Sequence, residues 1–201
     1  MRRRDPIAIV RNALVTLGLL CAPALGGPAD GAGERISAML AGLDALSDQA
    51  ALPDAEIAAR FAGIAKASFN RPAMARAALG TASDRLTRDQ WAAFLAAYSA
   101  HLERAFLRGV REAGASSSSV LASRRGADGV TVVVSRVTSA GREHDVLWFM
   151  CPDDRQRVCD VEIDGIRAST HQRADFADRM RAEGLDGLIR ALAAGWPGGG
   201  G

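Results

Sequence analysis

Apolar residues in the first part of the chain recur at helical spacing. Between residues 34 and 46 they are Ile36, Met39, Leu40, Leu43 and Leu46, which share one face of a helix. A second helix is expected from about Pro53, because proline is favourable in a first turn. A third, shorter helix is expected from Pro72 to just before Gly80, a favourable C-terminal cap. The pattern therefore predicts three helices before residue 80.

The clearest helical pattern follows Thr87. Thr87 and Gln90 match a capping box, in which the side chain of each residue bonds the backbone N–H of the other. The apolar positions after this start are Trp91, Phe94, Leu95, Tyr98, Leu102, Phe106 and Val110. They form one stripe, which predicts a long amphipathic helix that ends near Gly114.

Beyond the serine run at residues 116–119, the spacing changes from helical to extended. Four strands are predicted, over residues 119–123, 130–137, 145–151 and 158–163. Their short connections imply an antiparallel meander. Helices return after Gly165, where Ser169 and Gln172 form a second capping-box candidate, and Gly184 interrupts the last amphipathic stretch. The order predicts an α+β fold, with a four-stranded antiparallel sheet packed with about six helices.

Two of the predicted strands are apolar on both faces. Residues 130–134 and 146–150 lack the alternation of apolar and polar positions that a sheet with one solvated face normally shows. Two apolar faces need two covers, and helices can supply both. In the other interpretation, one face lines an internal cavity that accepts an apolar ligand. The pattern alone leaves both interpretations open.

The N-terminus has the order of a secretory signal peptide. Four arginines among residues 2–11 precede an apolar run at residues 13–20, and Ala22-Pro23-Ala24 resembles a cleavage site, with an alternative after Gly26. The run is shorter than the roughly 20 residues that cross a bilayer. A buried helix, an N-terminal anchor or a lipidated Cys21 are the alternatives. We expect a signal peptide at 1–26, one domain at 27–195, a disordered Gly-rich tail at 196–201, and hence a periplasmic protein.

The charge of the chain argues against nucleic acid as a partner. The whole chain has 25 basic and 23 acidic residues, a net charge of +2. Cleavage of the leader removes four arginines and Asp5, which leaves a net charge of about −1. No basic stripe then remains to neutralise phosphates.

Two cysteines remain after the expected cleavage, Cys151 and Cys159. An even pair in an exported protein favours a disulfide. Residues 152–155 between them are turn-forming, so the two cysteines would join the end of one strand to the start of the next. The alternative is a pair of buried thiols, and the C-x-x-C spacing of a redox pair is absent.

The sequence contains no recognisable catalytic motif, metal-binding motif or cofactor-binding motif. His101, His144 and His171 do not have metal-ligand spacing, and neither G-x-S-x-G nor a P-loop is present. Asp160, Glu162 and Asp164 fall on one strand face, for which solvation is a better explanation than a metal. We therefore predict no catalytic residue, no metal and no cofactor. The remaining enzyme hypothesis is a small cone-shaped dehydratase or isomerase with His144 and Asp145 in a pocket, although consecutive strand residues point to opposite faces.

The last third of the chain contains a series of short motifs. Residues 158–166 read VCDVEIDGI, and Arg173, Phe176 and residues 183–189, EGLDGLI, follow. Residues 69–75, FNRPAMA, 78–80, ALG, and 86–90, LTRDQ, add further motifs in the middle of the chain. In order and spacing these motifs resemble the MlaC family of periplasmic phospholipid-binding proteins, also called the toluene-tolerance family. The resemblance extends from about residue 36 to 192. Gln156 and Gln172 depart from the tryptophan and tyrosine that the family often has there.

The resemblance implies a fold that encloses an apolar pocket for acyl chains, and a protein that is not an enzyme. The implied partners are a phospholipid or related membrane lipid, an outer-membrane lipoprotein complex and an inner-membrane ABC transporter with a lipid-binding subunit. A related branch in hopanoid-producing bacteria makes a hopanoid an alternative cargo, and a non-lipid periplasmic adaptor is a rival role. Candidate lipid-binding residues are Phe69, Met74, Phe94, Tyr98, Leu102, Phe106, Val132, Val134, Leu147, Phe149, Val161, Ile163 and Phe176, with Arg173 at the pocket mouth.

Overall fold

The structure, a computed structural model, describes residues 31–154 and 156–196. Their helices are α1 (Ala32–Ser47), α2 (Asp54–Ser68), α3 (Arg71–Leu79), the 3-10 helix η1 (Gly80–Arg85), α4 (Arg88–Ala113) and α5 (Ala168–Ala193). Their strands are β1 (Ser116–Arg125), β2 (Thr131–Ser139), β3 (Arg142–Met150), β4 (Val158–Ile163) and β5 (Ile166–Arg167). The predicted α+β class is confirmed.

The five strands form one antiparallel sheet in the order β1-β2-β3-β4-β5. The sequence missed β5, because two residues are too few to show a period. It also placed the start of β1 too late: the serine run is part of the strand, with Ser116 opposite Ser139. The β2–β3 and β4–β5 turns have two consecutive residues at positive φ, Ala140-Gly141 and Asp164-Gly165, which matches the twist of a tight hairpin.

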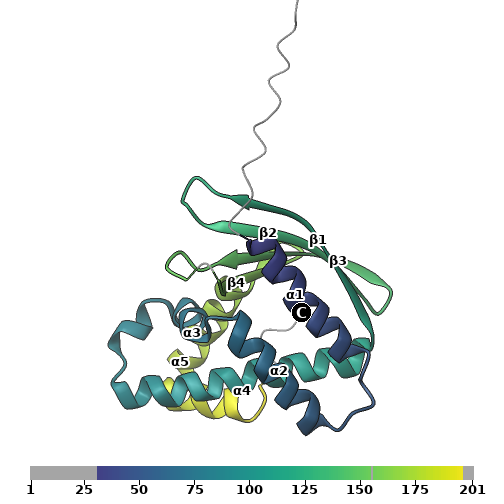
Figure 1. Ribbon diagram of the computed structural model, residues 1–201. Coiled ribbons are helices and arrows are strands. Elements are labelled where there is room, and N and C mark those ends of the chain that lie inside the picture. The colour runs from purple at the N-terminus through teal and green to yellow at the C-terminus, as the bar shows by residue number, and fades with distance from the viewer. Residues whose placement is uncertain (1–30, 155, 197–201) are drawn as a thin grey trace, which may run out of the picture.

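In Figure 1 the sheet lies at the top of the molecule, α4 runs along the bottom and α1 crosses between them. One face of the sheet packs on α1 in a buried cluster that includes Ile36, Leu40, Val133 and Trp148. A second cluster joins α3, α4 and α5 around Phe94 and Phe176, and a third joins α1, α2 and α4.

The helix ends agree with the sequence in one case and correct it in another. The Thr87 capping box is confirmed: Gln90 N–H donates to Thr87 Oγ1 at 3.2 Å, and Thr87 N–H to Gln90 Oε1 at 2.9 Å. The capping box expected at Ser169 is wrong, because α5 begins one residue earlier and Ser169 Oγ donates instead to Asp160 at 2.6 Å. Gly184 does interrupt α5, with φ 71° inside the helix.

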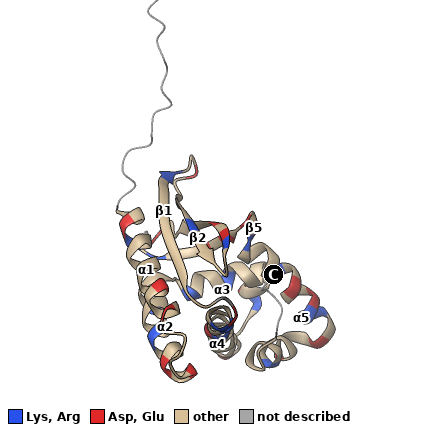
Figure 2. Ribbon diagram, turned by 90° about the vertical axis from the view of Figure 1, so that its right-hand side faces the viewer, with Lys and Arg blue, Asp and Glu red and all other residues tan. Residues whose placement is uncertain are grey.

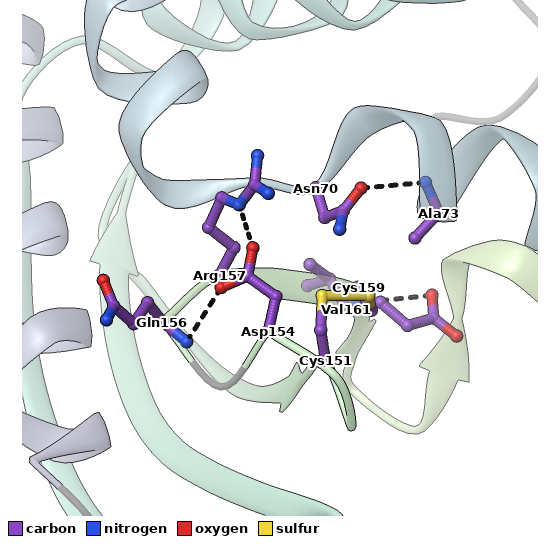
Figure 3. Close-up of a disulfide and its surroundings, with 9 residues drawn as sticks. Asn70, Ala73, Cys151, Asp154, Gln156, Arg157, Cys159 and Val161 are labelled. Carbon is purple, nitrogen blue, oxygen red and sulfur yellow. Dashed lines mark hydrogen bonds and ion pairs between the residues drawn. A yellow bond between two sulfur atoms is a disulfide. The ribbon is translucent and has the colours of Figure 1, made fainter.

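The predicted disulfide joins Cys151 and Cys159 across the β3–β4 turn. Figure 3 shows it beside the turn in which Asp154 accepts hydrogen bonds from Gln156 N–H and the Arg157 side chain. The start of β4 also holds the α2–α3 junction, because Asn70 N–H donates to Val158 O at 2.8 Å. The disulfide therefore fixes a turn next to the strand residue that is hydrogen-bonded to the α2–α3 junction.

Replacing both cysteines by alanine is expected to lower the free energy of unfolding by about 2.5 kcal/mol, because the cross-link no longer restricts a short loop in the unfolded chain. Urea unfolding measures the loss. As a control, a reductant should destabilise the wild type by a similar amount and leave the double variant unchanged. Equal stability of the oxidised and reduced wild type would contradict the prediction.

The expected leader at residues 1–26 lies outside the described residues, as do residues 197–201 of the expected tail. Trp196 is described, and its ring lies 6.1 Å from that of Phe176. None of the described helices is both long enough and apolar enough to traverse a membrane. Seen from the side shown in Figure 2, basic and acidic residues are interspersed and form no single basic stripe.

Candidate functional site

A cavity of about 410 Å³ lies between α1, α4 and one face of the sheet. Helix α1 contributes Leu40, Leu43, Asp44 and Ser47, and α4 contributes Phe106, Gly109 and Val110. The remaining lining residues are Gly114, Ser116, Ser118, Val137, Ser139, His144, Val146, Trp148 and Ile163. One face of the sheet therefore lines a cavity, but it is the same face that packs on α1, and the apolar residues of the other face are half-buried. The expectation that the two apolar faces have two separate covers is therefore wrong.

The apolar part of the lining is built on two buried residues of β3. Val146 and Trp148 follow each other on the same face of β3 and are 4% and 7% exposed. The Trp148 indole N–H donates to Ser135 Oγ at 2.8 Å, so the polar atom of the ring is satisfied inside the core. The bond fixes the ring while its apolar surface contributes to the cavity wall.

The polar part of the lining is concentrated at one end of the sheet. Ser116 is opposite Ser139, and in the next row Val137 is opposite both Ser118 and His144. The Ser116 and Ser118 hydroxyls donate to Asp44 Oδ1 at 2.7 and 2.9 Å. The cavity therefore has an apolar interior and one polar end.

His144 has an acidic partner at this end. Its Nδ1 lies 2.7 Å from Asp164 Oδ2, and Asp164 Oδ1 accepts from the Asp145 N–H at 3.0 Å. The bond with His144 and then the bond from Asp145 hold the pKa of the Asp164 carboxyl below its usual value. Asp145 itself binds the Arg136 guanidinium at 2.9 Å. The His144–Asp145 pocket pair of the enzyme hypothesis is therefore not formed.

The predicted lipid-binding residues fall into four groups, and Arg173 lies apart from all of them. Phe106 and Ile163 line the cavity. Met74, Phe94, Tyr98 and Phe176 belong to the α3–α4–α5 cluster, against which Phe69 and Leu102 pack. Val161 packs on the cluster beneath the sheet.

Val132, Val134, Leu147 and Phe149 lie on the opposite face from Val133 and Trp148, half-buried and outside all three clusters. The Arg167 guanidinium lies 3.6 Å above the centre of the Phe149 ring. Arg173 is not at the cavity: its Nε and Nη2 donate to Ala77 O at 3.1 and 2.8 Å, which ties α5 to α3. Of the predicted lipid-binding residues, the structure thus brings only Phe106 and Ile163 together at the cavity.

Several lining residues were missed by the sequence reasoning. The apolar residues of β2 and β3 at the cavity are Val137, Val146 and Trp148, the alternate positions to those chosen. Asp44 was missed because a polar residue between Leu43 and Leu46 reads as the solvated edge of α1. The antiparallel register could have found the His144–Asp164 pair, since Val146 is opposite Ile163, the residue before Asp164.

Two of the three carboxylates in the alternating run, Asp160 and Asp164, bind other side chains. Asp160 Oδ2 accepts from the Arg167 Nε at 2.8 Å, and Asp164 binds His144. Across residues 31–154 and 156–196, no group of three or more His, Cys, Asp or Glu side chains could hold a metal ion.

Two buried polar residues, Tyr98 and His101, lie in the helical part of the molecule outside the cavity. The Tyr98 hydroxyl donates to Gln172 Oε1 at 3.0 Å, and burial, followed by the charge of Asp160, raises the pKa of that hydroxyl. His101 is 2% exposed, and its Nδ1 has no hydrogen-bond partner within the described part of the chain. Burial lowers the pKa of His101, and the charges of Arg108 and Arg104 add to the effect.

His101 is expected to make the fold sensitive to acid. As the pH falls below the ordinary value of 6.5, the unfolded chain takes up a proton that the buried ring resists, so the free energy of unfolding decreases until the pH reaches the lowered native pKa. A His101→Leu variant should show a shallower loss of stability between about pH 7 and pH 5. Urea unfolding across this range measures the slope, with the exposed His171→Gln as a control. An unchanged slope in His101→Leu would contradict the assignment.

Comparison with known proteins gives one family and one fold. Among curated proteins, none matches the chain. The solved structure of a phospholipid-binding protein from Ralstonia solanacearum, in complex with a phospholipid, is similar with a TM-score of 0.70 at 17% identity. The match covers 81% of this chain and 95% of that one, and at this identity it establishes the shared fold. The model of the MlaC protein family matches residues 36–194, most of the chain, and the chain therefore belongs to the MlaC family.

Proposed function

We propose that this protein is a periplasmic lipid carrier that holds acyl chains of a membrane lipid in the cavity between α1, α4 and the sheet. The observation that carries the proposal is the lining itself. Leu40, Leu43, Val146 and Trp148 form an apolar wall, while the polar side chains gather at one end. A lipid has the same division between an apolar chain and a polar head.

The size and chemistry of the cavity suit such a cargo. A volume of about 410 Å³ falls within the range of small-molecule pockets, roughly 300–1,000 Å³. Burial of an acyl chain yields about 0.8 kcal/mol per methylene, so one chain provides on the order of 10 kcal/mol without specific polar contacts. A carrier of this kind requires cavity volume and an apolar wall, and its role includes no catalytic step.

The comparisons support the same role. The similar Ralstonia solanacearum protein is a phospholipid-binding protein in complex with a phospholipid. Membership of the MlaC family is consistent with the exported protein that the N-terminal sequence predicts. We extend the proposal to shuttling: the protein receives lipid from one membrane and delivers it to the other, between an outer-membrane lipoprotein complex and an inner-membrane ABC transporter.

Native mass spectrometry of the protein purified from a Gram-negative periplasm tests the binding proposal. The expected spectrum contains a protein–lipid complex, and organic extraction should release the same lipid in stoichiometric amount. Apolar adducts that vary between preparations, or a protein that carries no lipid and takes up none from vesicles, would overturn it. The shuttling step needs a separate measurement, transfer of labelled lipid between donor and acceptor vesicles in the presence of the protein.

A further inference from the structure

Asp44 is held at the polar end of the cavity with part of its carboxylate unused. Its Oδ1 accepts from the hydroxyls of Ser116 and Ser118, as described above. Among the residues that the structure describes, none donates a hydrogen bond to Asp44 Oδ2, and none forms an ion pair with the carboxylate. Because both serine hydroxyls donate their protons to Asp44, the three side chains together present only hydrogen-bond acceptors to a ligand in the cavity.

His144 adds a further acceptor to the same end. The Asp164 carboxylate that it contacts is ionised and can only accept a hydrogen bond, so the proton between them resides on His144 Nδ1. On a neutral imidazole this leaves Nε2 as an acceptor. The polar end therefore favours a ligand group that donates hydrogen bonds.

No lysine or arginine is among the cavity-lining residues of the described chain. Of the arginines close by in the sequence, Arg136 pairs with Asp145, and Arg111 binds Asp54 and the carbonyls of Ala50 and Leu52. Arg108, next to Gly109, and Arg142, opposite Ser139, are not among the lining residues. A phosphate placed beside Asp44 would find no cationic side chain among the lining residues and would meet a like charge, which is unfavourable in a partly buried site.

We propose that this polar end selects an uncharged, hydroxyl-bearing lipid head and disfavours a phosphate, with Asp44 as the residue that decides between them. A hydroxyl donates to Asp44 or His144 and loses little hydration when it enters an otherwise apolar cavity. A phospholipid can still bind with its chain in the cavity, provided that its phosphate stays outside in water. The inference rests on the proposed lipid-carrier function and specifies its substrate class.

Two lipids that differ only in the phosphate test the proposal. 1-Oleoylglycerol and 1-oleoylglycerol 3-phosphate compete with a fluorescent fatty-acyl probe for the mature protein at about pH 8. The neutral lipid should displace the probe at a concentration about tenfold lower, the ratio expected from one unfavourable charged contact. Equal potency, or stronger competition by the phosphate lipid, would overturn the proposal.

Asp44→Asn keeps the shape of the side chain and removes its charge, so the concentration ratio should fall toward one. The matched control is Asp48→Asn, an exposed position at the C-terminal end of the same helix that does not line the cavity. It should preserve the wild-type ratio. An unchanged ratio in Asp44→Asn would contradict the role of this carboxylate.

A second variant keeps the test valid if Asp44→Asn fails to fold. Ser139 lines the cavity opposite Ser116. The Ser139→Lys substitution brings an ammonium group to the polar end and leaves residue 44 as aspartate. The ratio should then shift in favour of the phosphate lipid, and no shift would count against the proposal. If neither lipid displaces the probe, or the probe itself does not bind, the lipid-carrier function fails; if both lipids bind with equal affinity, only the head-group inference fails.

Discussion

Gly109→Trp is expected to abolish most lipid binding while the protein remains folded. Gly109 lies on α4 at the cavity, and a Cβ added there meets nothing within 4 Å. The substitution is therefore sterically permitted, and tryptophan is a better helix residue than glycine. If the indole displaces only two methylenes of the acyl chain from the cavity, the free energy of lipid binding becomes less favourable by about 1.6 kcal/mol. This corresponds to more than a tenfold loss of affinity. Titration with a fluorescent fatty-acyl probe measures it.

Gly63→Trp is the matched control. Gly63 is also an exposed helical glycine whose added Cβ meets nothing within 4 Å, but it lies on α2 and does not line the cavity. The variant should bind the probe like the wild type. Unimpaired binding by a folded Gly109→Trp protein would show that the ligand occupies another place.

Phe176→Ala is expected to destabilise the fold by about 3–5 kcal/mol, because it leaves a cavity in a closely packed aromatic cluster. Phe176 is 1% exposed, and its ring meets those of Phe94 and Tyr98 edge-on at 6.0 and 6.3 Å. Trp196 packs on it from the end of the described chain. Urea unfolding measures the change in the free energy of unfolding.

Phe149→Ala serves as the comparison, since it removes the same ring from the half-buried face of the sheet. It loses partial burial and the contact with Arg167, for which about 1–2 kcal/mol is expected. A loss from Phe149→Ala as large as that from Phe176→Ala would mean that a cover lies on this face of the sheet.

The elements of the fold could be predicted from local patterns in the sequence. Helix α4 has a capping box and an unbroken apolar stripe, and the cysteine pair flanks a turn between two strands. These signals need only neighbouring residues. The two-residue strand β5 has no such signal, because its pairing with β4 depends on the turn at Asp164 and Gly165.

Which strand face lines the cavity could not be read from the sequence. Residues 132–134 are all valine, and residues 146–150 are apolar throughout, so the period of two leaves no preferred side. Only the packing of α1 on the face that carries Val133 and Trp148 decides it. Most of the strand candidates were chosen on the other face for this reason.

The aromatic stripe of α4 poses the same problem in helical form. Phe94 and Tyr98 pack into a buried cluster, whereas Phe106, three turns beyond Phe94, lines the cavity. An apolar stripe predicts that a residue is buried, but only the tertiary structure shows whether it packs against other side chains or lines a cavity. The polar end was hidden similarly, because Asp44, Ser118 and His144 lie far apart in the sequence and meet only in the folded chain.

Fluorescence of Trp148 tests the central claim, that acyl chains occupy the cavity, most directly. A protein with Trp91→Phe and Trp196→Phe keeps Trp148, in the cavity wall, as its only tryptophan. The matched control keeps only Trp91, which packs beside Phe94 and Arg76 away from the cavity. The ligand is a dibromostearoyl lipid, presented both as a glycerol ester and as a phospholipid, because bromine quenches an indole only on close approach. The account predicts saturable quenching of Trp148 by at least one of the two lipids and little quenching of Trp91. Equal quenching of both tryptophans, or none of Trp148 by either bound lipid, would contradict it.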